Sequence, residues 1–188
     1  MDSTESDEML ALSLQNGNEV ALEALMERYT GKLLRYGKRF FASDEDAIAD
    51  VVQEVFISAY ENIRSFDSAR RFSPWVYRIA HNAFVDAVRK KAKGPLSYDA
   101  LELDRLLPHQ IYEDPDEKEK EAAEMRVLVE KHLQELTPAY REIIDLYYFE
   151  NFSYQEISEV LHIPSGTVGI RLSRAKAKLK DLLKKDSV

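Results

Sequence analysis

Apolar residues recur at steps of three and four along most of the chain, which is the period of an amphipathic helix. One such run covers 18–36, and a second covers 44–63 with Ser43 as its expected cap. A third begins at Ser73 and Pro74, a residue pair that is favoured at the start of a helix. The alternation of apolar and polar residues that is typical of a strand is absent from the sequence. The pattern therefore predicts an all-α fold.

The segment 94–117 interrupts this pattern. Its periodicity is poor, and it contains prolines and many acidic residues. We expect a partly extended, acidic linker there. It divides the chain into two small helical domains, predicted over 1–93 and 118–188. The second domain is short, so its hydrophobic core can only be modest.

The second predicted domain has the signals of a helix-turn-helix. Thr137 and Pro138 begin one helix, and Ser153 and Glu156 have the spacing of a capping box that starts a short second helix. Ser165 is the expected cap of a longer, basic helix that ends the chain. A short helix, a tight turn and a longer helix form a helix-turn-helix, whose second helix enters the major groove of DNA. The alternative is a helical hairpin with a solvated lysine face.

The last predicted helix also shows which of its side chains face away from the core. At about 100° per residue, Ile170, Ser173 and Arg174 point away from the apolar stripe. Arg174 is placed to contact a guanine edge, Ser173 a base or phosphate, and Ile170 a thymine methyl group. The neighbouring cations suit phosphates, which position a protein without reading sequence. The predicted duplex-binding set is Ser165, Thr167, Ile170, Arg171, Ser173, Arg174, Lys176 and Lys178.

Aromatic residues and arginines are interleaved between 64 and 89. Single-stranded nucleic acid needs this combination, because unpaired bases stack on aromatic rings and cations bind the backbone. A base drawn out of a duplex also needs hydrogen-bonding groups, which Asn82 is placed to supply. The alternative is that the rings fill the core, as we expect for half of them. The predicted strand-binding set is Phe66, Arg70, Arg71, Phe72, Trp75, Arg78, Asn82 and Arg89.

Charge and composition narrow the classes of function. The net charge is −8, yet basic residues gather in two blocks, 64–93 (net +6) and 165–188 (net +5), on either side of the acidic stretch 94–125 (net −7). Two separated basic blocks predict two contacts with a polyanion, although solvated helix ends would give the same pattern. The absence of cysteine excludes a disulfide framework, a thiol nucleophile and a zinc–thiolate site.

An enzyme is not expected from this sequence. The four histidines are scattered, and none forms a metal-binding pair at the spacing that a helix requires. We therefore expect no catalytic residue, metal, cofactor or small-molecule substrate. No apolar run is long enough to cross a membrane, and the acidic start lacks the apolar segment of a signal peptide. The expected location is the cytoplasm, without membrane insertion.

Taken together, these motifs resemble the extracytoplasmic-function (ECF) sigma factors of bacterial RNA polymerase, which keep only regions 2 and 4 of the larger sigma factors. The resemblance covers roughly 19–93 and 123–183. Its motifs are DVVQEVF at 50–56, FSPWVYRIAHN at 72–82, DAVR at 86–89, LTPAYREI at 136–143, SYQEI at 153–157 and IPSGTV at 163–168.

The resemblance implies a promoter-specificity subunit rather than an enzyme. It implies that Asp50, Gln53 and Glu54 contact the clamp helices of the polymerase β′ subunit. It also implies that the loop 65–73, with Asn82, holds a flipped base and the melted strand of the −10 element, while the last helix reads the −35 element as duplex. The family further implies an anti-sigma factor as a partner. Because the acidic chain should bind DNA poorly alone, core polymerase would have to make the two weak contacts act together.

One position departs from the family pattern. Where the family usually carries Lys or Arg after Gly-Thr-Val, this chain has Gly169, followed by Ile170 instead of a small hydroxyl residue. Glycine within a helix costs about 1 kcal/mol relative to alanine, so we expect an unusual −35 preference or weaker binding. A second reading remains open, namely a helix-turn-helix regulator that binds duplex operators without polymerase. It explains 137–188 but leaves the aromatic and basic stretch without a role.

Overall fold

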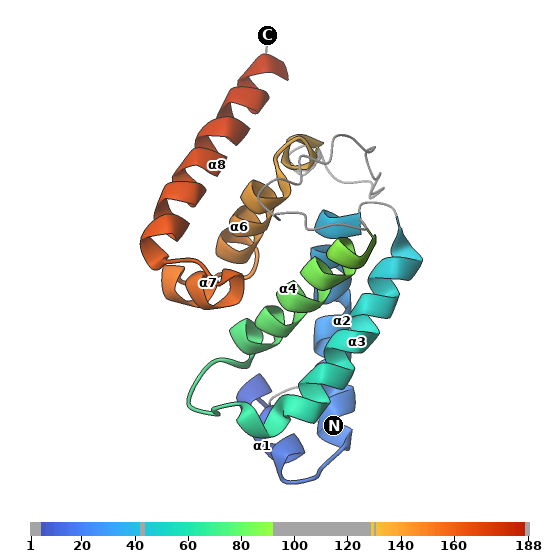
Figure 1. Ribbon diagram of the computed structural model, residues 1–188. Helices are drawn as coiled ribbons and strands as arrows, with labels where there is room; N and C mark the ends of the chain where they lie inside the picture. The colour runs from blue at the N-terminus through green and yellow to red at the C-terminus, as the bar shows by residue number, and fades with distance from the viewer. Residues whose placement is uncertain (1–4, 42–43, 92–128, 130, 187–188) are drawn as a thin grey trace, which may run out of the picture.

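The computed structural model describes residues 5–41, 44–91, 129 and 131–186. All regular structure in these residues is helical, which confirms the all-α prediction. The linker predicted over 94–117 lies outside the described residues. The elements, drawn in Figure 1, are α1 (Asp7–Gln15), α2 (Val20–Phe41), α3 (Glu45–Asn62), a 3-10 turn η1 (Ile63–Ser65), α4 (Phe72–Lys91), α6 (Pro138–Tyr148), α7 (Tyr154–Leu161) and α8 (Ser165–Asp186).

Helix α1 has no counterpart among the elements predicted from sequence. The hydroxyl of Ser6 accepts a hydrogen bond from the Met9 amide at 3.3 Å and so caps the helix. Leu10 on its inner side is buried against the rest of the fold. A carboxylate oxygen of Glu8 accepts from the backbone amide of Phe72 at 3.0 Å. Helix α1 therefore caps the start of α4, which lies far along the sequence.

Two of the helix starts predicted in the first half of the chain need correction. The cap of α3 is Asp44, whose side chain accepts from the Ala47 amide at 3.2 Å. Ser43, the predicted cap, lies outside the described residues. Helix α4 begins at Phe72, one residue before the predicted Ser73, because Glu8 of α1 satisfies the Phe72 amide.

Helices α2, α3 and α4 form a three-helix core with a close approach at Gly37. A Cβ atom on Gly37 would lie 2.5 Å from Cγ2 of Ile48 on α3 and 2.6 Å from Cζ of Phe84 on α4. Only glycine leaves room for both neighbours. The predicted apolar stripe of the run 44–63 is buried except for Tyr60, which is 43% exposed and donates its hydroxyl proton to Glu19 at 3.2 Å. Its buried members are Val51, Val52, Val55, Phe56, Ala59 and Ile63.

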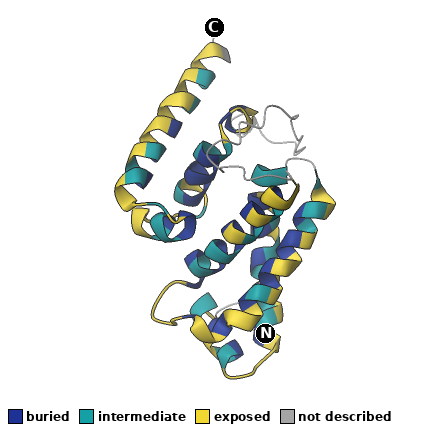
Figure 2. Ribbon diagram, in the orientation of Figure 1, coloured by how far each residue is buried: buried dark blue, intermediate teal, exposed yellow. Residues whose placement is uncertain are grey.

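The two halves of the chain pack directly on each other, with α4 against α7 and α2 against α6. A buried polar cluster joins them. The Tyr36 hydroxyl of α2 donates to Glu142 of α6, and Nδ1 of His81 on α4 lies 2.8 Å from the same carboxylate. Arg39 forms an ion pair with Asp145 nearby. In Figure 2 the buried residues gather where the helices face one another, whereas α8 is exposed along most of its length.

Candidate nucleic-acid interface

The loop between η1 and α4 carries much of the predicted strand-binding set, and α1 holds it in place. The side-chain amide of Gln15 donates to the backbone carbonyls of Ile63 at 2.8 Å and Phe66 at 2.7 Å. Glu8 binds the Phe72 amide at the other end of the loop. Neither Glu8 nor Gln15 is among the residues predicted from the sequence. The one sequence signal for α1 is its start, where a serine cap precedes two acidic residues. The helix itself is too short to display a clear helical period.

Two rings of the predicted strand-binding set lie in the core. Phe66 is 5% exposed and Phe72 is 3% exposed. Both pack against Trp75, with ring centroids 5.4 Å and 5.5 Å away, and Phe72 also packs against Tyr29 at 5.4 Å. Both rings are therefore mostly covered in this conformation, although Phe66 reaches the wall of the cavity beside this loop, and their contact with a DNA strand stays a prediction. Trp75 itself is half-buried and remains a candidate platform.

A cavity of about 290 Å³ lies between this loop and α7. Its walls include five residues of the predicted strand-binding set on one side, Phe66 among them, and the carboxylates of α7 on the other. Asn82 and Arg89 are exposed further along α4 and are not part of the wall. The lining residues that matter here are Arg70, Arg71, Trp75, Arg78, Glu156 and Glu159.

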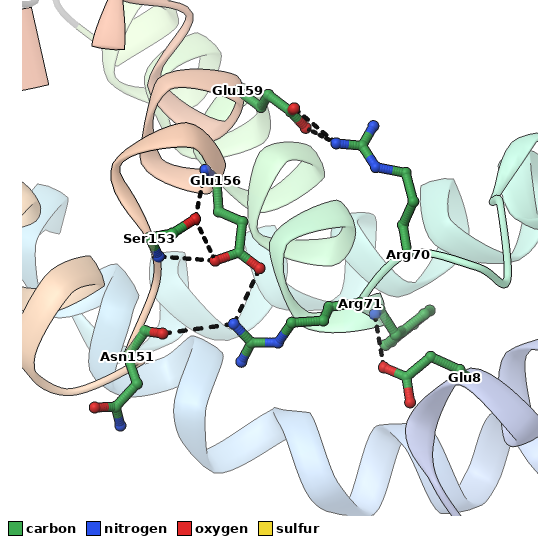
Figure 3. A network of polar contacts seen from close by, with 8 residues as sticks. Glu8, Arg70, Arg71, Asn151, Ser153, Glu156 and Glu159 are labelled. Atoms are coloured by element: carbon green, nitrogen blue, oxygen red, sulfur yellow. Dashed lines mark hydrogen bonds and ion pairs between the residues drawn. The ribbon is translucent and has the colours of Figure 1, made fainter. Parts of the chain in front are cut away.

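Both arginines of the loop are bound by glutamates of α7, as Figure 3 shows. Nη2 of Arg70 lies 2.6 Å from both carboxylate oxygens of Glu159. Nη1 of Arg71 lies 3.0 Å from Oε1 of Glu156, and its guanidinium group lies over the Phe152 ring at 5.6 Å. The loop predicted to bind one nucleic-acid strand therefore contacts the helix-turn-helix in this structure.

The predicted helix-turn-helix is present. The Ser153 hydroxyl accepts from the Glu156 amide at 3.2 Å and the Glu156 carboxylate accepts from the Ser153 amide at 2.7 Å, which confirms the capping box. Helix α7 ends at Leu161, and the C-cap residue His162 adopts the left-handed conformation with φ of 54°. Ser165 is the first residue of α8 rather than its cap, because the carbonyl of Pro164 already accepts helical hydrogen bonds.

The outward face of α8 matches the predicted duplex-binding face. Ile170 is 57% exposed, and Ser165, Ser173 and Arg174 are exposed as well. A shallow cavity of about 320 Å³ runs along this face, between the start of α6 and the first turns of α8. Its walls are Thr137, Ala139, Tyr140, Thr167, Ile170, Arg171 and Arg174.

Two lysines lie beside this face. Lys178 is exposed on the flank of α8. Nζ of Lys176 lies over the ring of Tyr148 on α6, 5.9 Å from its centroid. A hydrogen bond to the Tyr148 hydroxyl raises the pKa of Lys176, so its charge is retained. Both cations thus lie beside the predicted duplex-binding face of α8.

Gly169, the departure from the family pattern, faces a tyrosine. A Cβ atom at this position would lie 3.3 Å from Cε2 of Tyr154 at the start of α7. The Tyr154 ring also packs against Tyr147, with centroids 5.6 Å apart. The ring thus covers the part of α8 where the family usually carries a cation, and glycine allows it to lie close.

The residues predicted to contact polymerase occupy one exposed face of α3. Asp50, Gln53 and Glu54 are all exposed there, and Ile57 one turn further is 59% exposed. A single exposed apolar side chain is common on protein surfaces and does not by itself mark a binding site. The helical period predicts that these four side chains share one face, and their contact with polymerase stays a prediction.

Among the residues that the structure describes, no three histidine, aspartate or glutamate side chains are grouped so as to hold a metal ion. None of the described helices combines the length and apolar character needed to cross a membrane.

Each half of the chain matches a known protein family. The family described as Sigma-70 region 2 matches residues 25–94, and the family described as Sigma-70, region 4 matches residues 126–179. The ECF RNA polymerase sigma factor SigW of Bacillus subtilis is 32% identical, over 91% of this chain and 93% of its own length. The ECF RNA polymerase sigma-E factor of Haemophilus influenzae is 31% identical, over 94% of each.

Solved structures of similar fold cover nearly the whole chain. CnrH, solved in complex with the cytosolic domain of CnrY, matches with a TM-score of 0.66 and 28% identity, over 97% of this chain and 99% of CnrH. The sigma factor RpoE in complex with the anti-sigma factor NepR from Bartonella quintana has the same fold, with a TM-score of 0.64 and 24% identity over 86% of this chain and 96% of RpoE.

Proposed function

The chain belongs to the ECF sigma factors of RNA polymerase, and from that premise we propose that its two halves read one promoter in two different forms. The first half holds the melted −10 strand, and the second reads the −35 element as duplex. The observation that carries this proposal is the difference between the two basic surfaces. One is a cavity with a tryptophan and three arginines, and the other is an exposed helix face.

The −10 surface is proposed to use Trp75, Arg78 and Asn82 together with the loop arginines. Trp75, Arg78 and Asn82 lie at steps of three and four on α4, so they share one side of the helix. A tryptophan ring stacks on an unpaired base, an arginine binds the backbone, and an amide can hydrogen-bond a flipped base. Melting then follows from trapping unstacked bases, and no covalent step is needed. In this role the protein is not an enzyme.

The −35 surface is proposed to use the exposed face of α8. Arg174 lies at its centre and is placed for a bidentate contact with guanine, while Ile170 is placed against a thymine methyl group. Lys176, Lys178 and the first turn of α8 bind phosphates and set the register. Replacing Arg174 with alanine should cost about 1–3 kcal/mol at a single base position. A uniform loss over all sequences would mean that Arg174 contacts phosphate alone.

Two protein partners follow from the family. Asp50, Gln53 and Glu54 on α3, with Ile57, are proposed to dock on the clamp helices of the polymerase β′ subunit. An anti-sigma factor is proposed as an inhibitor, and the likeness to CnrH, solved with the cytosolic domain of CnrY, supports a partner of this kind. Both roles place the protein in the cytoplasm with the polymerase. The family matches support domains over 1–93 and 118–188, joined by a linker.

Run-off transcription with purified core polymerase over a library of promoters tests this function. We expect selective initiation at promoters that share a −10 and a −35 sequence. Trp75→Ala and Asn82→Ala should reduce open-complex formation while binding to core polymerase stays unchanged, and Glu23→Ala on α2 is a control for an exposed change elsewhere. Undiminished melting in both variants would contradict strand capture. Tight operator binding by the lone chain, with no response of polymerase, would favour the duplex-binding regulator.

A further inference from the structure

The two loop arginines of the proposed −10 surface already have anionic partners, and both partners lie on α7. Arg70 is bound by Glu159 and Arg71 by Glu156, at 2.6 Å and 3.0 Å. A guanidinium group binds a carboxylate and a phosphate with the same fork of N–H donors. The glutamates therefore offer these arginines the kind of contact that a DNA strand would offer.

We infer that α7 is an intramolecular competitor of the promoter strand. Glu159 binds Nη2 of Arg70 and Glu156 binds Nη1 of Arg71, so in the free chain strand phosphates must compete with these carboxylates for the −10 surface. The cavity beside Trp75 is closed on one side by the same two carboxylates. The inference rests on the proposed function, because it takes Arg70 and Arg71 to be strand contacts.

This competition is selective for one of the two DNA surfaces. Ile170, Ser173 and Arg174 are exposed in the same conformation, so the duplex-reading face of α8 stays accessible. Closure of the two halves therefore hides the single-strand surface and leaves the duplex surface open. This asymmetry gives the inference a signature that a general change in DNA affinity would not produce.

Buried contacts between the two halves of the chain fix how the halves pack on each other. Glu142 of α6 is held by Tyr36 of α2 and His81 of α4, and all three side chains are buried. Phe152, which precedes α7, packs edge-on against Tyr77 with centroids 5.4 Å apart. A buried carboxylate is stable only with its partners in place, so these contacts fix where α7 lies. The glutamates of α7 are thereby brought to the loop arginines.

The arginine–glutamate pairs are suited to being displaced. The side chains of Arg70 and Glu159 are 57% and 31% exposed, so water and salt weaken their attraction. A DNA strand that presents several phosphates at once, on a polymerase that holds the halves apart, can replace two such pairs. Strand binding and closure compete for the same guanidinium groups, so each weakens the other.

The test compares binding of single-stranded and duplex DNA by the full chain. The variant Glu156→Gln with Glu159→Gln removes both charges, and glutamine at the first position retains the capping box. Its matched control is Glu23→Gln with Glu27→Gln on the exposed side of α2, which changes the net charge equally. The probes are a labelled single-stranded oligonucleotide pool of random sequence and the same pool as duplex.

We expect the α7 variant to bind the single strand about two- to tenfold more tightly than the control variant, with equal affinity of both for duplex. The chain has no cysteine, so dyes can be attached through Met26→Cys on α2 and Lys184→Cys on α8. Energy transfer between them should fall when the single strand is added to the otherwise unchanged protein. Equal single-strand affinity of the two variants, or an equal gain for duplex, would overturn the inference. Promoter-specific transcription by the α7 variant with core polymerase would show in that case that the proposed function still stands.

Discussion

The carboxylate of Glu156 serves two partners at once, because Oε1 binds Nη1 of Arg71 at 3.0 Å while Oε2 accepts from the Ser153 amide at 2.7 Å. One oxygen thus contacts the other half of the chain and the other completes the capping box of α7 (Figure 3). Partial burial opposes ionisation here, but the Ser153 hydrogen bonds and the charge of Arg71 outweigh it and lower the pKa of Glu156.

These two roles of Glu156 can be separated by substitution. Glu156→Gln keeps a side chain that closes the capping box but removes the charge that binds Arg71. Glu156→Ala removes both contacts and should cost about 1 kcal/mol more in the free energy of unfolding. Urea denaturation of the two variants and the unchanged protein measures the difference. Equal losses for the two variants would mean that the hydrogen bond from the Ser153 amide to the Glu156 side chain contributes nothing to the stability of α7.

The buried His81–Glu142 pair predicts a pH dependence of the contact between the halves. Burial disfavours the charged imidazole, but the carboxylate of Glu142 outweighs burial and raises the pKa of His81 above its ordinary value of 6.5. A raised histidine pKa stabilises the folded state fully below 6.5, and this contribution is lost as the pH rises through the raised value. His162 has the opposite effect on the pH dependence of stability, because burial and the nearby charges of His81 and Arg78 lower its pKa.

Urea denaturation at a series of pH values tests this prediction. The loss of stability caused by His81→Gln should be largest below 6.5, the ordinary histidine value, and should shrink as the pH rises through the raised pKa of His81. His162→Gln serves as the matched control, and its effect should change with pH in the opposite sense. Curves for His81→Gln and the unchanged protein that run parallel at every pH would contradict the role of the pair.

The helix-turn-helix could be predicted because its signals are local. A capping box needs only the spacing of Ser153 and Glu156, and the outward face of α8 follows from helical period. The contact between Arg70 and Glu159 could not be predicted, since the two residues are 89 positions apart and one lies in a loop while the other lies on a helix. Periodicity shows which side of a helix is apolar, but it does not show which polar side chains meet across an interface.

The aromatic residues of the first half show a second limit of the sequence. Interleaved rings and cations predicted a strand-binding surface, yet the order of residues does not reveal which rings turn inward. Phe66 and Phe72 are buried because α1 holds the ends of their loop against the core. The apolar stripe of α1 is too short to be recognised by its period, so neither the helix nor its effect on the loop could be anticipated.

The close packing around Gly37 predicts that even an alanine at this position lowers the free energy of unfolding. A Cβ atom there would lie 2.5 Å from Ile48 and 2.6 Å from Phe84, far inside normal contact distance. Gly37→Ala would gain helix propensity, but the overpacking should outweigh that gain and destabilise the fold by about 1–3 kcal/mol. Gly31→Ala is the matched control on the same helix, where the nearest atom is 3.6 Å away at the end of the Arg35 side chain. Thermal unfolding should show a loss at Gly37 and no loss at Gly31.

Gly169 and Tyr154 should be energetically coupled. Gly169→Ala adds about 1 kcal/mol of helix propensity, but its Cβ would press on the Tyr154 ring at 3.3 Å. Tyr154 is partly exposed and can move by a few tenths of an ångström, so part of the gain should remain. In a Tyr154→Ala background the obstacle is gone, and Gly169→Ala should then give its full gain.

A double-mutant cycle measures this coupling directly from the free energies of unfolding of the four proteins. The same pair of backgrounds also tests the −35 surface. Gly169→Arg restores the cation that the family usually carries, but with Tyr154 present its side chain must turn around the ring. We therefore expect Gly169→Arg to strengthen duplex binding more in the Tyr154→Ala background than alone. Gly169→Ala could change the free energy of unfolding equally with and without Tyr154, and Gly169→Arg could likewise change duplex affinity equally in both backgrounds. That result would show that the tyrosine does not determine which side chain position 169 can carry.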